Sequence, residues 1–183
     1  MKPQPILETP RLWLRPFTLE DAPTVQALAG AREIAAVTGH VPHPYEDGMA
    51  EQWISGHPRA WEEGKAAVFA IVLRESDSLV GAMDMGISAH FHHAELGYWI
   101  GVPFWGQGFA TEAARATVGF GFEKLGLHRI HASHLACNPA SGRVMEKIGM
   151  QYEGCLRQHV SKWDEFHDLI MRGVLAEEWN KAQ

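Results

Sequence analysis

Two glycines, Gly106 and Gly108, stand directly before a long run of small and apolar residues. Glycine has no side chain to keep an anion away from the main chain. Where such a turn opens a helix, several backbone N–H groups lack helical partners, and the helix dipole adds partial positive charge. The turn therefore predicts a phosphate or diphosphate site. It is not a P-loop, because no lysine follows at the required spacing, and an ordinary tight loop is the alternative interpretation.

The elements around this turn determine whether it can bind an anion. Residues 110–125 predict a helix, since small or apolar residues recur there every three or four positions. Residues 94–101 and 129–137 predict the strands before and after this helix. In a strand–helix–strand unit, ligands bind at the carboxyl ends of the strands. The glycine turn lies at that end.

The rest of the chain predicts an α/β fold with a mixed sheet. Hydrophobic periodicity predicts further strands at 6–15, 67–74, 79–88, 151–158 and 165–175, and further helices at 18–30, 45–63 and 139–148. Polar or glycine-containing turns separate most of these segments.

Composition limits the function classes. The chain has 183 residues, 46% of them hydrophobic, which fits one domain spanning residues 1–183. A net charge of -6 argues against nucleic acid as the main partner. Cys137 and Cys155 show neither metal-ligand spacing nor a disulfide framework. No signal peptide or membrane span is visible, so we expect a cytoplasmic protein without membrane partners.

Two segments carry a family resemblance. The sequences GYWIG at 97–101 and WGQGFATEA at 105–113 resemble the acetyl-CoA-binding motif of the GNAT acetyltransferase superfamily. The sequence NPASGRVMEKIGM at 138–150 resembles the second signature of its RimJ/RimL-like branch, which acetylates ribosomal-protein alanines. The resemblance implies a mostly antiparallel central sheet of about seven strands, splayed at its centre and flanked by about four helices. It also implies acetyl transfer from acetyl-CoA to an amine.

The resemblance and the anion-site argument together predict the cofactor contacts. Pantetheine amides are expected to pair with exposed strand backbone, and the diphosphate with the amides of the glycine turn. The predicted cofactor-binding residues are Trp99, Ile100, Val102, Gly106, Gln107, Gly108, Phe109, Ala110, Thr111 and Asn138.

Amide formation from a thioester needs a neutral amine, a stabilised oxyanion and a proton for the thiolate. Glu95 is the predicted base: the resemblance supports an acid at this place, and by alternation it shares a strand face with Gly97 and Trp99 and would point toward the acceptor. Ser141 is the predicted acid, or a hydroxyl that binds the sulfur. Family members often carry a tyrosine where this chain has Met145, and methionine cannot donate a proton. The identity of the acid is therefore open.

Each of these roles has a structural alternative. Glu95 fits an ordinary salt bridge, and Ser141 fits the third position of a helix capped by Asn138 with Pro139 at its first position. Six histidines gather at 90, 92, 93, 128, 131 and 134 without the cysteines that would complete a zinc site. No metal is expected, and a histidine-rich zinc-binding protein is the weakest alternative.

The sequence favours direct transfer to a protein N-terminal α-amine or a small-molecule amine, without an acyl-enzyme on Cys137. A catalytically degenerate acetyl-CoA sensor or docking module is the alternative, motivated by Met145. The acceptor segments, expected at 31–45 and 57–65, do not identify the amine. The oligomeric state is equally open, with a homodimer as one possibility.

Overall fold

The computed structural model describes residues 3–181. Its strands form one sheet in the order β1-β2-β3-β4-β5-β6-β8-β7. Their bounds are β1 (Leu7–Glu8), β2 (Leu12–Arg15), β3 (Ala66–Leu73), β4 (Leu79–Ser88), β5 (His93–Ile100), β6 (Arg129–Leu135), β7 (Gln151–Lys162) and β8 (Glu165–Leu175). The described pairs are antiparallel except β5–β6, which is parallel. The prediction of a mixed, mostly antiparallel sheet is confirmed.

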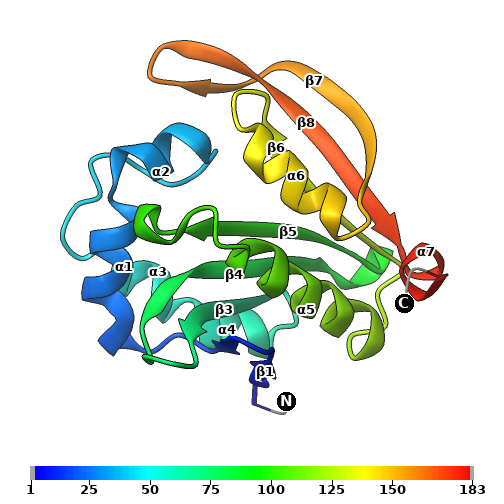
Figure 1. Cartoon of the computed structure of the whole chain (residues 1–183), viewed down its shortest axis with the longest axis horizontal. Helices are drawn as coiled ribbons and strands as arrows, with labels where there is room; N and C mark the ends of the chain where they lie inside the picture. The colour runs from blue at the N-terminus through cyan, green and yellow to red at the C-terminus, as the bar shows by residue number, and fades with distance from the viewer. Residues whose placement is uncertain (1–2, 182–183) are drawn as a thin grey trace.

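Helices cover both faces of this sheet (Figure 1). The α-helices are α1 (Ala22–Ala29), α2 (Arg32–Val37), α3 (Met49–Ser55), α4 (His57–Glu62), α5 (Phe109–Glu123), α6 (Pro139–Lys147) and α7 (Ala176–Lys181), with short 3-10 turns η1 (Leu19–Asp21), η2 (Ala89–Phe91) and η3 (Val102–Phe104). One core cluster joins α5 and α6 to the sheet, and a second joins α1, α2 and α3 to the opposite face. None of the described helices is long and apolar enough to cross a membrane.

Helix α5 packs closely on the sheet because its buried face contains small residues. Ala113, Ala114 and Thr117 are fully buried there. A Cβ at Gly121 would lie 2.7 Å from Ile130 Cδ1 on β6, so the helix needs a glycine at this point. The sequence prediction for this helix is confirmed to within two residues at each end.

The N-terminal third differs from the prediction in three places. The single strand expected at 6–15 is a hairpin of β1 and β2, because Pro10 sits in a turn closed by the Thr9 N–H bond to Leu12 O. The helix expected at 45–63 is two short helices that meet at Gly56, with a proline in the first turn of α4. Helix α2 falls within a segment expected to be a loop, since six residues are too few to display a periodicity. With these differences and the C-terminal helix α7, the described residues contain eight strands and seven α-helices, where about seven and about four were expected.

Strands β5 and β6 separate partway along their length, as the resemblance predicted. They pair at four positions, of which the last is Leu96 with Ala132. Beyond that pair, β5 continues along β4 as far as Ile100, and β6 continues along β8 as far as Leu135. A gap therefore opens in the middle of the sheet on the side where both strands end.

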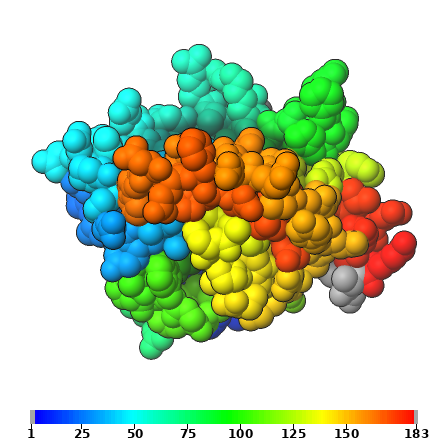
Figure 2. Space-filling model, turned by 90° about the horizontal axis from the view of Figure 1, so that it is seen from above, coloured from blue at the N-terminus to red at the C-terminus, as the bar shows by residue number. Residues whose placement is uncertain are grey.

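The β7–β8 hairpin reaches beyond the sheet and meets the α2–α3 segment. The Lys162 ammonium donates hydrogen bonds to the carbonyls of Thr38 (2.7 Å) and Val41 (3.3 Å). The Arg32 guanidinium stacks on the Trp163 ring at 4.9 Å. Seen from above, the orange hairpin lies across the yellow α6 region and borders the blue and cyan residues (Figure 2). The hairpin thus forms one wall beside the gap.

Candidate active site

A cleft of about 1220 Å³ follows the gap between β5 and β6. Its walls come from both faces of the sheet and from the hairpin. The lining segments are 37–41, 95–100, 104–106, 108–111, 133–135, 137–141 and 159–160, together with Ile34, Asp84, Gly86, Arg143, Val144, Lys147 and Leu169. The cleft connects the glycine turn at one end with the exposed carboxylate of Glu95 at the other.

The glycine turn has the geometry expected of an anion site. Gly106 and Gly108 have left-handed φ angles of 75° and 83°, and Gly108 is the N-cap of α5. The N–H groups of the first turn of an α-helix have no carbonyl partner one turn earlier, so here they point toward the cleft. The Gln107 side chain donates to Pro103 O (3.2 Å), so it shapes the turn and leaves the main chain to meet a ligand.

Charges around the first turn of α5 are arranged to leave this site open to an anion. Glu112 would repel a phosphate, but its carboxylate is bound by Thr9 Oγ1 (2.7 Å), Arg11 N (2.9 Å) and Arg11 Nε (2.7 Å). These hydrogen bonds lower the pKa of Glu112 against the effect of burial and neutralise its charge locally. Arg143 and Lys147 on α6 add positive charge to the cleft wall.

Beyond Leu96, every second residue of β5 directs its main-chain N–H and C=O groups into the gap rather than toward β4. The Gly101 N–H binds Val80 O (2.8 Å), so the odd-numbered residues of this strand direct their main-chain groups to β4. Tyr98 and Ile100 therefore face the gap, and the Ile100 carbonyl already accepts the Trp105 indole N–H (2.6 Å). The Trp99 main chain pairs with β4, which leaves its side chain as the group that can contact a ligand.

Helix α6 places a serine hydroxyl at the cleft. Its N-cap, Asn138, accepts from Ser141 N (3.2 Å) and donates its side-chain amide to Val37 O (3.1 Å). The predicted local bond from Ser141 to the cap is thus present. The Ser141 Oγ also lies 2.7 Å from the Tyr98 hydroxyl, a contact between two elements that the sequence did not indicate. Burial raises the pKa of Tyr98 to about 12, so this phenol is protonated at neutral pH.

Met145 takes no part in the cleft lining, because its side chain is 1% exposed and belongs to the core beneath α6. Tyr98 on β5 and Ser141 on α6 both line the cleft and offer it a pair of hydrogen-bonded hydroxyl groups. Strand periodicity identified Tyr98 as part of β5 but gave no sign of its partner.

The carboxylates at the other end of the cleft come from two strands. Glu95 is exposed on β5, and Ser133 Oγ on β6 lies 3.5 Å from its Oε1. Asp84 on β4 is partly buried beside it. Burial and the Glu95 charge raise the pKa of Asp84 to about 6, against a lowering by His40. The sequence reasoning missed Asp84, although a single acid in the apolar run of β4 was a visible signal.

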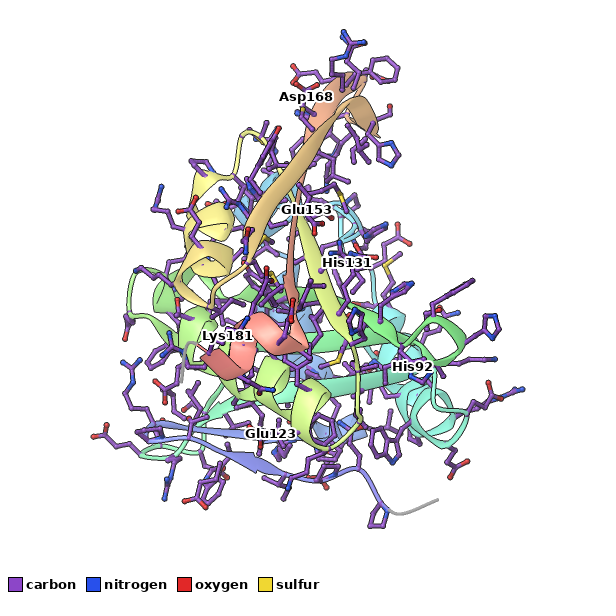
Figure 3. The ribbon with its side chains drawn as sticks, turned by 90° about the vertical axis from the view of Figure 1, so that its right-hand side faces the viewer. His92, Glu123, His131, Glu153, Asp168 and Lys181 are labelled. Atoms are coloured by element: carbon purple, nitrogen blue, oxygen red, sulfur yellow. The ribbon has the colours of Figure 1, made fainter. Side chains whose placement is uncertain are left out.

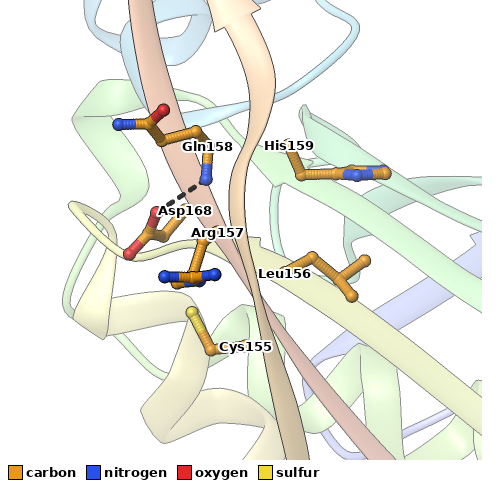
Figure 4. A pocket seen from close by; sticks show the side chains of 6 residues that line it. All are labelled: Cys155, Leu156, Arg157, Gln158, His159 and Asp168. Atoms are coloured by element: carbon orange, nitrogen blue, oxygen red, sulfur yellow. Dashed lines mark hydrogen bonds between the residues drawn. The ribbon is translucent and has the colours of Figure 1, made fainter.

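A bulge in β7 changes which side chains face the cleft. The register between β7 and β8 shifts between Leu156 and Val160, and Gln158 has a left-handed φ of 51°. The Gln158 N–H binds the Asp168 carboxylate (2.8 Å), which holds the bulge in place. Leu156 and His159 project to the same side of the strand as a result (Figure 4). His159 then lines the cleft, where strict alternation would have turned it away.

The histidines do not form a metal centre. Figure 3 shows His131 on β6 and Glu153 on β7. Glu153 forms an ion pair with Arg129, and both side chains lie over Gly173 of β8. Burial lowers the pKa of His131, despite the opposing effect of Glu95. Within residues 3–181, no group of three or more potential ligands is placed to hold a metal ion.

Residues 11–151 match the acetyltransferase (GNAT) domain family. The chain belongs to the GNAT acetyltransferase family. The uncharacterized N-acetyltransferase YnaD of Bacillus subtilis (strain 168) is 31% identical over 95% of this chain and 99% of its own length. A GNAT-family acetyltransferase structure from Bacillus anthracis has a TM-score of 0.83 and 28% identity, covering 94% of this chain and 99% of that one. The family prediction and the fold class are confirmed.

Membership in the GNAT family establishes acetyl-CoA as the cosubstrate and the chain as an N-acetyltransferase. A relative with a named acceptor is the ribosomal protein uS5-alanine N-acetyltransferase of Escherichia coli (strain K12), which is 23% identical over 67% of this chain and 64% of its own length. The groups that this GNAT chain offers to coenzyme A fit its chemistry: helix N–H groups and cations for phosphates, and open strand backbone for pantetheine amides.

Proposed function

We propose that this enzyme transfers the acetyl group of acetyl-CoA directly to a primary amine, either a protein N-terminal α-amine or a small-molecule amine. One observation supports this most strongly: the gap between β5 and β6 joins an anion-binding helix turn to a carboxylate-lined opening. A thioester held along the gap would lie with its acyl end near Glu95, where an amine can reach it.

In this proposal the main chain binds the cosubstrate. The N–H groups of Gly108, Phe109, Ala110 and Thr111 hold the diphosphate, with Gly106 and Gln107 shaping the turn. Tyr98 and Ile100 pair with pantetheine through main-chain groups that face the gap, and Val102 follows them in η3. Trp99 contributes its side chain, and Asn138 contributes the one side-chain N–H that Val37 leaves available.

Two side chains act on the reacting groups. Glu95 accepts a proton from the amine at the mouth of the cleft. Ser141 donates its hydroxyl hydrogen bond to the departing sulfur when the Tyr98 phenol gives its single proton to Ser141 Oγ (2.7 Å) rather than to the Ser141 carbonyl (3.1 Å). An α-amine has a reference pKa of about 7.7–8.0, against about 10.4 for lysine, so an α-amine demands less of the base.

Replacing Tyr98 with phenylalanine is expected to lower kcat by about 2–10-fold, the range of one lost hydrogen bond of about 0.5–1.5 kcal/mol. The Kd for acetyl-CoA is expected to stay within about twofold. Steady-state kinetics and calorimetry check both values, with the exposed Tyr152→Phe as the matched control. In a Ser141→Ala background the same substitution should have no further effect, and a full additional loss would show that Tyr98 acts independently of Ser141.

The function is tested by incubating the protein with acetyl-CoA and a panel of amines while free thiol is measured. The panel contains an alanine-initiated peptide, a lysine side-chain peptide with a blocked N-terminus, and spermidine. Amine-dependent thiol release supports the proposal. Tight acetyl-CoA binding without release for any amine would instead identify a sensor. Intact mass after incubation with acetyl-CoA alone is expected to show no added acetyl group, and an adduct lost in Cys137→Ser would overturn direct transfer.

The partners expected from the sequence belong to the same proposal. We place the enzyme in the cytoplasm, where acetyl-CoA is available, with no nucleic acid partner because of its net charge of -6. A homodimer is compatible with this function, and sedimentation analysis is the measurement that decides it.

A further inference from the structure

Asp84 occupies a position that only a glycine neighbour permits. It pairs in register with Gly97 of β5, and its carboxylate lies across that residue. A Cβ at Gly97 would be 2.6 Å from Asp84 Oδ1, so any other residue at 97 would displace the carboxylate. Because Gly97 has no side chain, the space beside it in the middle of the sheet can hold the negatively charged Asp84 carboxylate.

This carboxylate lies at the point where the gap begins. Leu96 is the last residue of β5 that pairs with β6, and Gly97 is the next. Asp84, Glu95 and Gly97 all line the cleft. Asp84 and Gly97 share a face of the sheet because they are paired, and Glu95 shares it by alternation. The two carboxylates thus flank the start of the gap, one on each of two adjacent strands.

Few groups offset the charge of Asp84. The facing ionisable groups are Glu95 on β5 and His40 in the α2–α3 segment, and its β3 neighbour Val68 carries no charge. His131 on β6 acts on Glu95 from the far side. Within the described residues, neither a hydrogen bond nor an ion pair satisfies the Asp84 carboxylate. A partly buried carboxylate in this situation costs stability, and a cationic ligand would remove that cost.

We propose that Asp84 and Glu95 form a carboxylate pair that binds the ammonium group of the acceptor amine and takes its first proton. The inference rests on the proposed acetyl transfer and assigns the acceptor end of the same cleft. The ligand class is a primary ammonium, whose three N–H groups can reach both carboxylates at once. The nitrogen then lies beside Gly97, next to the part of β5 that faces the gap.

The proton count of the reaction balances with this pair. The ammonium gives one proton to the pair and becomes a neutral amine. Its nitrogen then bonds to the acetyl carbon while the carbon–sulfur bond breaks, and the nitrogen loses a second proton. One proton ends on the sulfur of coenzyme A, and one is released to solvent when the pair returns to its charged form.

The first test is kinetic and uses the full chain with the alanine-initiated peptide and with spermidine. Asp84→Asn is expected to lower kcat/KM for whichever amine is the acceptor by about 10²–10⁴-fold, the range of a general base. The Kd for acetyl-CoA should change less than about twofold. Asp77→Asn is the matched control, because Asp77 lies in the exposed β3–β4 turn with a left-handed φ of 54° that asparagine also adopts.

The pH profile separates a proton acceptor from a merely structural carboxylate. With a pKa of about 6 for Asp84, kcat/KM of the unmodified enzyme should fall as the pH drops below about 6. That limb should disappear in Asp84→Asn. Carboxyl-carbon NMR of the protein without ligand should show the same titration near pH 6, shifted to lower pH by Glu95→Gln, since the Glu95 charge raises the pKa of Asp84.

Thermal stability gives a readout independent of the acceptor. Folding raises the pKa of Asp84 from 3.8 to about 6, so its charge destabilises the fold above about pH 6 and has no effect below about pH 3.8. Asp84→Asn should therefore raise the Tm by a few degrees at pH 7.5 and leave it unchanged at pH 3.5. A structural carboxylate would show the opposite, a lower Tm.

The outcomes distinguish this inference from the proposed function. If Asp84→Asn lowers the Tm at pH 7.5, or keeps full kcat/KM while the unmodified enzyme turns over, the carboxylate pair is wrong and the enzyme stands. If the unmodified protein acetylates none of the amines but Asp84 titrates near pH 6, the proposed function fails and the cation site stands as a binding site. Titration of Asp84 near pH 4 overturns the inference in either case.

Discussion

Gly108→Val is expected to weaken acetyl-CoA binding by about 100-fold or more. The substitution places a β-branched residue at a φ of 83°, which only glycine adopts without strain, and sets its side chain over the N–H groups of the first turn of α5. Hydrogen bonds from such groups to a charged ligand contribute about 1.5–3 kcal/mol each, so losing one or two accounts for the effect. Isothermal calorimetry with acetyl-CoA measures it.

Gly126→Val is the matched control for that experiment. Gly126 also has a left-handed φ, 65°, and an added Cβ meets nothing within 4 Å, but it lies beyond the other end of α5, outside the cleft lining. Both variants carry similar backbone strain and should lose similar stability. Equal acetyl-CoA affinities in the two variants would show that the glycine turn is not the phosphate site.

Gly81→Ala is expected to lower the free energy of unfolding by about 2–4 kcal/mol. A Cβ at Gly81 would lie 2.3 Å from the Trp99 carbonyl oxygen and 3.1 Å from Ile100 Cα, and both are main-chain atoms that a rotamer change cannot move. Strands β4 and β5 would have to separate where β5 borders the gap. Urea denaturation followed by circular dichroism measures the loss.

The control for this second prediction lies on the same strand. Gly86→Ala places its Cβ 3.9 Å from Glu95 O, an ordinary contact, in another β4–β5 pair. Its stability is expected to stay within about 1 kcal/mol of the unmodified chain. If Gly81→Ala is as stable as Gly86→Ala, the close approach of the two strands is not a constraint on the fold.

The local structure of the proposed cosubstrate half was predictable because its signals are local. The glycine turn, the small-residue stripe of α5 and the Asn138 cap each lie within a few consecutive residues, and the structure places all three as expected. The acceptor half depends on contacts between distant residues. The Asp84–Gly97 pairing depends on the register of β4 and β5, and the Tyr98–Ser141 bond depends on where α6 packs against β5. No single segment of the sequence encodes either arrangement.

Errors in the fold prediction have the same origin. Pro10 and Gly56 were visible breaks, yet each stood inside a longer apolar pattern that favoured one continuous element. Helix α2 has six residues and is held by its contacts with the second core rather than by a pattern of its own. Short elements that tertiary packing stabilises give weak sequence signals.

The two faces of the sheet suggest how the acceptor specificity of this enzyme can be changed by mutagenesis. Helices α5 and α6, which we propose as the cosubstrate-binding elements, pack on one face, while the α2–α3 segment and the tip of the β7–β8 hairpin border the opening on the other. Substitutions in separate regions combine nearly additively. Variant libraries restricted to residues 38–48 and 157–163 are therefore expected to change which amines the enzyme accepts. Binding of acetyl-CoA should be retained in these variants.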